Sequence, residues 1–241
     1  MEYVMGQAKQ RKDSGEIDYW YHGTNEYFDT WGNPPIKSKY KPELLVHSFI
    51  SLSKDQPLAK GAGNSTGGLC RSKLSHTAKV LDLTKRSDQS EEHWRLVVTS
   101  ELGKSHELIQ TYEGFIKACI SGEVLRMHTS DRALAEHFQK TQETLQNSAT
   151  PLKERAIAFQ EAQNYTRNWI ETVIHPAKCS GYDALICSEI DRYRDTGPKP
   201  CRNLHVFNSS MLSAPDWISI PDESTMVEAL KELKSLKLAE H

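Results

Sequence analysis

Strand-like segments lie near both ends of the chain, and helix-like periodicity fills its middle. The strand-like segments are short, rich in aromatic or aliphatic residues, and bounded by residues that favour turns. They cover residues 18–24, 46–53, 79–83, 181–187, 203–207 and 217–220. Strands early and late in the chain, with helices between them, indicate an α+β fold with strands of mixed direction in a split sheet.

Helical patterning dominates the middle of the chain. It divides into three predicted helices, at about 90–120, 129–147 and 151–174. Pro176 is expected to end the third of them, because proline has no N–H to continue the helical hydrogen bonds. A leucine-rich stripe at 224–240 predicts a last helix that packs into the core.

The length of 241 residues fits one large domain or two small ones. No internal repeat or low-complexity stretch divides the chain. We therefore predict a single domain over residues 18–241, with a helical insertion at about 88–175. A polar segment, residues 1–17, precedes it.

The charges nearly balance, with 30 Lys and Arg against 32 Asp and Glu and a formal net charge of −2. No overall positive field therefore exists to hold nucleic acid or an anionic membrane, although a local patch would be enough. No apolar run approaches the roughly 20 residues of a membrane span, and the N-terminus lacks the apolar core of a secretory signal. We expect no membrane partner and a cytoplasmic location, in the producing cell or in a target cell.

The five cysteines are widely spaced and none forms a CxxC pair. Their odd number argues against a disulfide framework, and their spacing argues against a zinc ribbon. The ten histidines are scattered and show no HExxH pattern. We therefore expect a reducing compartment and no metal site.

Two predicted loops have compositions that suit ligand contact. Residues 61–68 hold four glycines in eight positions but lack the Lys-Ser/Thr of a phosphate-binding loop, so a mobile lid is one interpretation. Residues 188–201 form a charged loop with a small basic and aromatic cluster, Arg192, Tyr193 and Arg194. Such a cluster can stack on a base, pair with a phosphate or an acidic protein face, or be a solvated turn.

Three segments carry the candidate chemistry. The first is Tyr21-His22-Gly23-Thr24 at the end of a strand, where a glycine lets a ligand approach the backbone. The second runs from Phe49 through Ser51 and Ser53, and the third is Gly181-Tyr-Asp-Ala-Leu-Ile followed by Asn203-Leu-His-Val-Phe. Each alone also has an ordinary reading: a histidine at a turn, a helix cap, and a hairpin with a long loop.

In this order, the three segments resemble the ADP-ribosyltransferase superfamily, in particular its His-Tyr-Glu branch, which includes diphtheria toxin and the poly(ADP-ribose) polymerases. The resemblance implies NAD⁺ as co-substrate, bound in a split, curved sheet. It implies that His22 bonds a ribose hydroxyl, that the Gly23 backbone holds the nicotinamide carboxamide, and that Tyr21 and Thr24 belong to the same site.

The second segment can be aligned with the family pattern in two registers. In one, Phe49 or Ile50 takes the place of the family tyrosine that stacks on nicotinamide. In the other, Ser51 and Ser53 resemble the Ser-Thr-Ser element of the cholera-toxin branch, whose first serine supports the catalytic carboxylate. Phe49, Ser51 and Ser53 are therefore all candidates for NAD⁺ binding.

The third segment departs from the family pattern, because Asn203 stands where the catalytic glutamate is expected. That glutamate favours the cation formed as nicotinamide leaves, and an amide can accept the same hydrogen bond but brings no charge. The departure weakens an expectation of chain elongation more than one of single transfer. Glu189 is the nearest carboxylate, and either Asn203 or Glu189 could support the ribose.

The resemblance implies a mono-ADP-ribosyltransferase that cleaves NAD⁺ and modifies a macromolecular acceptor, either a protein or a nucleic-acid base. A toxin, effector or defence factor fits it by analogy, with an inhibitory antitoxin or immunity protein as a possible partner. Two alternatives stay open: an inactive module that binds a nucleotide or partner, motivated by Asn203, and an RNA 2′-phosphotransferase-like enzyme, motivated by Arg202.

Overall fold

The computed structural model describes residues 18–34, 45–62, 67–126, 139–141, 143–144, 146–191 and 198–221. Its strands are β1 (Tyr19–Thr24), β2 (Ile50–Ser53), β3 (Gly68–Lys73), β4 (Val80–Asp82), β5 (Ala184–Asp191), β6 (Lys199–Val206) and β7 (Asp216–Ser219). The six predicted strands are all present. β3 was not predicted, because its residues directly follow a glycine-rich stretch.

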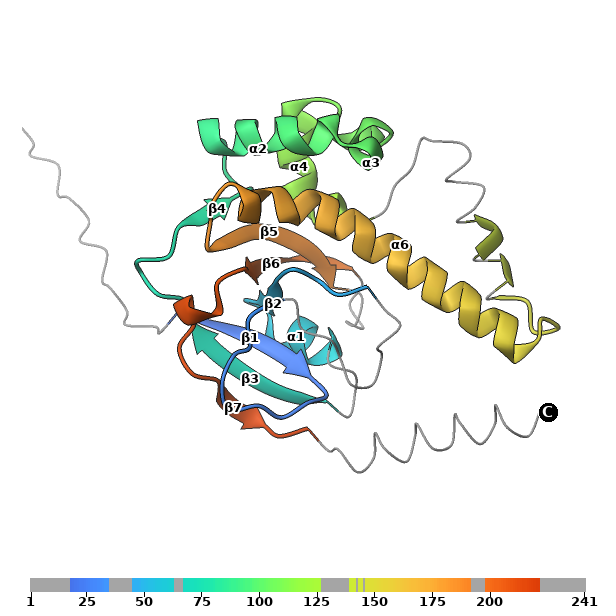
Figure 1. Cartoon of the computed structure of the whole chain (residues 1–241), viewed down its shortest axis with the longest axis horizontal. Helices are drawn as coiled ribbons and strands as arrows, with labels where there is room; N and C mark the ends of the chain where they lie inside the picture. The colour runs from blue at the N-terminus through green and yellow to red at the C-terminus, as the bar shows by residue number, and fades with distance from the viewer. Residues whose placement is uncertain are drawn as a thin grey trace, which may run out of the picture.

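These strands form one sheet in the order β4-β5-β6-β2-β1-β3-β7 (Figure 1). β4 and β5 are parallel and the other neighbours are antiparallel, so the predicted α+β fold with a mixed sheet is confirmed at that level. The ladders are uneven. β5 and β6 pair over all of Ala184–Asp191, whereas the described residues of β1 and β2 pair at one position, Tyr21 opposite Ser53. The sheet is therefore nearly divided between β1 and β2.

Helices between β4 and β5 in the chain cover one face of the sheet beside β5 (Figure 1). They are α2 (Asp88–Thr99), α3 (Glu101–Lys104), α4 (Tyr112–Ser121) and α6 (Leu152–Cys179), with short 3₁₀ turns η1 (Glu107–Ile109) and η2 (Glu123–Leu125). The core beneath them includes fully buried Phe115, Val97, Val173 and Leu185. Residues 88–175 are thus mostly helical where the structure describes them.

A second core lies on the other face of the sheet. It joins Trp20 of β1 with Leu52 of β2 and Leu204 of β6, and all three are buried. α1 (Gln56–Ala62) follows β2, and η3 (Ser209–Met211) follows β6. Because Trp20 packs with residues of β2 and β6, this core holds the two parts of the sheet together across the sparse β1–β2 pairing.

Residues 90–120 are not one helix, contrary to the prediction. α2 ends at Thr99, and Ser100 accepts a hydrogen bond from the Gly103 N–H at 3.0 Å, which begins the next short helix. A Cβ on Gly103 would lie 1.9 Å from the Val97 carbonyl oxygen, so the glycine permits a tight reversal there. The chain then passes through η1 into α4.

Pro176 does not end α6, which continues to Cys179 with the proline inside it. Proline removes a single N–H, and the last turn retains other bonds, including Ser180 N–H to the Pro176 carbonyl at 3.0 Å. Ala177, the next residue, is fully buried, and its packing helps to hold this turn against the sheet. The predicted stop was wrong by one turn.

The predicted loop at 188–201 was also too long. β5 runs on to Asp191 and β6 begins at Lys199, so most of this segment is paired strand. Its centre, 192–197, lies outside the described residues, as do the predicted segments 1–17 and 224–240. The glycine-rich stretch begins inside α1 and ends at the first residue of β3, and the described residues between 139 and 146 are helical.

Candidate functional site

His22 lies where β1 and β2 separate. Its Nδ1 is 2.8 Å from the Ser51 carbonyl oxygen of β2, although the backbone pairing of the two strands is recorded only at Tyr21 and Ser53. A carbonyl accepts but cannot donate, so Nδ1 carries the hydrogen. In the neutral ring Nε2 is then an acceptor, the form that can receive a hydrogen bond from a ligand hydroxyl.

Aromatic side chains surround this histidine. The Trp31 and Phe28 rings meet it edge-on, with centroids 5.4 and 6.2 Å from the imidazole, and Trp217 of β7 packs against Phe28. Burial lowers the pKa of His22 below its ordinary value, and the bond to Ser51 opposes part of that effect. His22 is therefore neutral at pH 7. Sequence analysis did not single out this aromatic group.

A row of polar side chains crosses three strands beside the split. Tyr21 lies opposite Ser53, and Ser53 lies opposite Asn203. Residues directly opposite each other in a ladder project from the same face, and two strand spacings amount to about 10 Å. Tyr21, Ser53 and Asn203 therefore share one face. His22 departs from the opposite face of β1, and its ring turns into the gap toward Ser51.

Asn203 is 2% exposed at the centre of the sheet, between β5 and β2. Its Nδ2 donates a hydrogen bond to Glu189 Oε2 at 2.6 Å, and its Oδ1 is buried without a hydrogen-bond partner among the described residues. An unpaired buried acceptor is costly, so this oxygen is a place for a donor from a ligand.

Glu189 belongs to β5 and not to a loop, which corrects the prediction. It lies opposite Cys201, two residues along the hairpin from the pair of Cys187 and Asn203, and therefore on the same face. The ladder therefore brings its carboxylate to the amide from a neighbouring strand.

Of the other predicted NAD⁺-binding residues, some lie at the site and others contribute to the packing and turns around it. Ser53 accepts a hydrogen bond from the Asp55 N–H at 3.0 Å at the entry to α1. Phe49 is buried in the helix-covered core, 4.8 Å edge-on from His205, and is not placed to stack on a ligand. Gly23 pairs with Leu69 of β3, and Thr24 accepts a bond from the Glu26 N–H at 3.1 Å.

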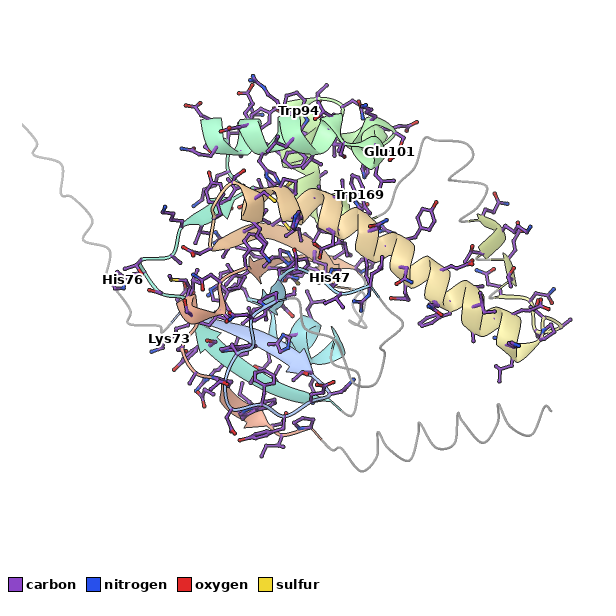
Figure 2. The ribbon with its side chains drawn as sticks, viewed as in Figure 1. His47, Lys73, His76, Trp94, Glu101 and Trp169 are labelled. Carbon is purple, nitrogen blue, oxygen red and sulfur yellow. The ribbon has the colours of Figure 1, made fainter. Side chains whose placement is uncertain are left out.

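Beneath Asn203 on the same face of β6 is His205, which is 2% exposed and lies 3.4 Å from the Cys187 sulfur through Nε2. Burial lowers the pKa of His205 to about 3. Figure 2 shows His47 beneath α6, where its Nδ1 is 2.9 Å from Glu171 Oε1. The first contact joins β6 to β5, and the second joins the segment before β2 to α6.

The structure thus brings His22, Ser51, Ser53, Asn203 and Glu189 to neighbouring strands, while Arg192, Tyr193 and Arg194 lie outside the described residues. Within the described ranges, no group of three or more His, Cys, Asp and Glu side chains is arranged to hold a metal ion. Where the chain is described, no helix is long and apolar enough to cross a membrane. No protein-family model, curated protein or solved structure matches the chain.

Proposed function

We propose that this protein is a mono-ADP-ribosyltransferase that cleaves NAD⁺ between nicotinamide and ribose. The observation that carries the proposal is the buried Asn203, whose amide oxygen has no partner among the described residues. It lies in register with Ser53 and Tyr21, next to the split from which His22 projects. A ribose diol offers the hydroxyl donors that such acceptors would take.

His22 supports a binding role more than a proton-transfer role. Its ring is neutral, its Nδ1–H is occupied by Ser51, and Nε2 is the acceptor that remains in that tautomer. A neutral acceptor in a desolvated setting suits a ribose hydroxyl. Loss of the ring would therefore weaken NAD⁺ binding and misplace the ribose.

The reaction needs positioning and electrostatic support rather than a covalent enzyme intermediate. The bond from C1″ to nicotinamide nitrogen breaks, and nicotinamide leaves with the electron pair. The cation at C1″ then accepts a lone pair from the acceptor, which loses one proton to solvent. Acceptors and a carboxylate near the ribose favour the cation as it forms.

Arg202 gives no support to the 2′-phosphotransferase alternative. It projects from the opposite face of β6 to its neighbour Asn203, and it is 2.7 Å from Asp82 in an ion pair. An arginine engaged there is not placed beside the amide and carboxylate. A basic residue at the candidate site is what that alternative requires.

The test incubates the purified full chain with NAD⁺ and a cell lysate and follows nicotinamide and labelled ADP-ribose by mass spectrometry. We expect nicotinamide release with a labelled macromolecule, and loss of both in His22→Ala. His76→Ala is the matched control, because His76 is exposed on the turn before β4 (Figure 2). Label that resists RNase and is lost with protease identifies a protein acceptor, and the reverse identifies nucleic acid.

Absence of turnover in the folded wild type would overturn the transferase proposal. If NAD⁺ then still bound, with affinity reduced in His22→Ala, the nucleotide-binding module would replace it. Free ADP-ribose without a labelled macromolecule would restrict the activity to NAD⁺ hydrolysis.

A further inference from the structure

We infer that Glu189 of β5 supplies the negative charge for the reaction, and that Asn203 of β6 is its positioning residue. This inference rests on the proposed function. It assigns the carboxylate to the strand next to the one where the family resemblance expects it. Glu189 would then carry the negative charge, and Asn203 would hold the Glu189 carboxylate in position.

The first support is the direction of the hydrogen bond. Asn203 Nδ2 donates to Glu189 Oε2 at 2.6 Å, so the amide holds this carboxylate oxygen in place. An amide in this orientation presents Oδ1 as its remaining acceptor, and that atom is buried without a partner among the described residues. One hydroxyl of a bound ribose can bond to Oδ1 while the carboxylate lies next to it.

The second support is the rigidity of the strands that carry the two side chains. Asn203 is 2% exposed in β6, which pairs on one side with β5 and on the other with β2. The backbone of Glu189 is held as well, because a Cβ on Gly122 would lie 2.9 Å from its carbonyl carbon. A carboxylate fixed from both directions costs little to orient when the substrate binds.

The charge also has a step to act on. As the C1″–N bond lengthens, the electron pair leaves with nicotinamide and positive charge develops on the ribose. Glu189 attracts that charge, and Asn203 Oδ1 accepts a hydrogen bond from a hydroxyl of the same ribose. After water or the acceptor attacks C1″, the proton it loses passes to solvent, and both residues return unchanged.

The experiment compares four variants of the full chain in nicotinamide release from NAD⁺, with folding checked by thermal unfolding. We expect Glu189→Gln to lower kcat by about 100-fold or more with little change in KM. Asn203→Ala should lower kcat by roughly 10-fold to 100-fold, because a displaced carboxylate is poorly aligned. The double variant should be no slower than Glu189→Gln alone, because both changes disable one unit.

Asn203→Glu separates this assignment from its rival. If position 203 is a catalytic glutamate that has been lost, restoring the carboxylate raises kcat. If Glu189 acts, a second carboxylate beside it lowers kcat. The acid limb of the pH–rate profile then moves to higher pH, because two adjacent carboxylates do not both stay ionised easily. A residue with only a structural role would not move that limb.

Glu107→Gln is the matched control, since Glu107 is exposed on η1. An active wild type with an unaffected Glu189→Gln, or an activated Asn203→Glu, would overturn the assignment and leave the proposed function intact. An inactive wild type would remove the proposed function and this inference together. The two failures are therefore distinct.

Discussion

The β5–β6 ladder and the β1–β2 junction are built by different means. β5 and β6 pair along all eight residues of each strand, and fully buried side chains such as Leu185 and Leu204 lie on both of its faces. At the junction, the described residues give one paired position, and the ring of His22 bridges to Ser51. Backbone bonds fix the first region, and side chains fix the second.

This difference places the candidate chemistry where the two regions meet. Asn203 and Glu189 belong to the rigid ladder, whereas His22 belongs to the strand that separates from it. Active sites need acceptors held in place and also a gap that a substrate can enter. The predictions that follow test how firmly each region is held.

Acid is expected to weaken the ladder and the helices that cover it, because each region holds a buried histidine: His205 on β6 and His93 on α2. Burial lowers the pKa of His205 to about 3 and of His93 to about 4. Unfolded histidine titrates near 6.5, so the unfolded chain binds more protons below that pH, and stability present above 6.5 is lost as the pH falls. Each histidine contributes about 1.4 kcal/mol per pH unit, or about 5 kcal/mol for both between pH 6.5 and 4.5.

The measurement is urea unfolding across that pH range for wild type and for His93→Gln, whose amide can still bond the Val173 carbonyl as the imidazole does at 2.8 Å. In the variant, the free energy of unfolding should fall less steeply with decreasing pH, by about 1.4 kcal/mol per pH unit, which is the contribution of one histidine. His76→Gln, at an exposed position, should follow the wild type. Equal slopes in all three proteins would contradict the assignment of the acid sensitivity to His93.

Removing a large ring from the helix-covered core should cost slightly less. Phe115 of α4 is fully buried in the cluster that joins α4 and α6 to the sheet. Phe115→Ala is expected to lower the free energy of unfolding by about 3–5 kcal/mol, through lost burial and a cavity. Phe159→Ala is the control, because that ring is 48% exposed on α6. Similar costs for both would show that the core is packed differently.

Much of this contrast could be predicted from the sequence, but not its hydrogen bonds. Alternation and apolar runs located β1, β2 and β4–β7, and helical periodicity located α6. β3 was missed because Gly67 and Gly68 end a glycine-rich stretch, while the strand depends on pairing with β1. The sequence pointed to Asn203 and Glu189 separately. Their contact depends on the register of the β5–β6 hairpin, which a long predicted loop concealed.

Gly122 offers a way to disturb the ladder without substituting any residue of β5 or β6. Its φ is +82°, and a Cβ there would lie 2.9 Å from backbone atoms of Glu189 and Ile190. Gly122→Ala is expected to cost about 2–3 kcal/mol, by left-handed strain together with this contact. Gly181 has a φ of +79° with open space around it, so Gly181→Ala should cost about 1 kcal/mol.

Thermal and urea unfolding of the two glycine variants would give this difference directly. If Gly122 also fixes the backbone of Glu189, Gly122→Ala should slow nicotinamide release more than Gly181→Ala does. Equal costs in the two variants would mean that the strand shifts to accept the methyl group.

The smallest expected change tests the junction itself. Trp31 meets His22 edge-on, and its Nε1–H donates to the Ser213 carbonyl at 2.9 Å. Trp31→Phe keeps an aromatic ring but loses this hydrogen bond, so we expect a cost of about 1 kcal/mol. Hydrogen exchange should quicken at the amides of β1 near His22 and stay unchanged in β5 and β6, because the β1–β2 junction depends on side chains. Faster exchange throughout the sheet would instead show that both regions open as one unit.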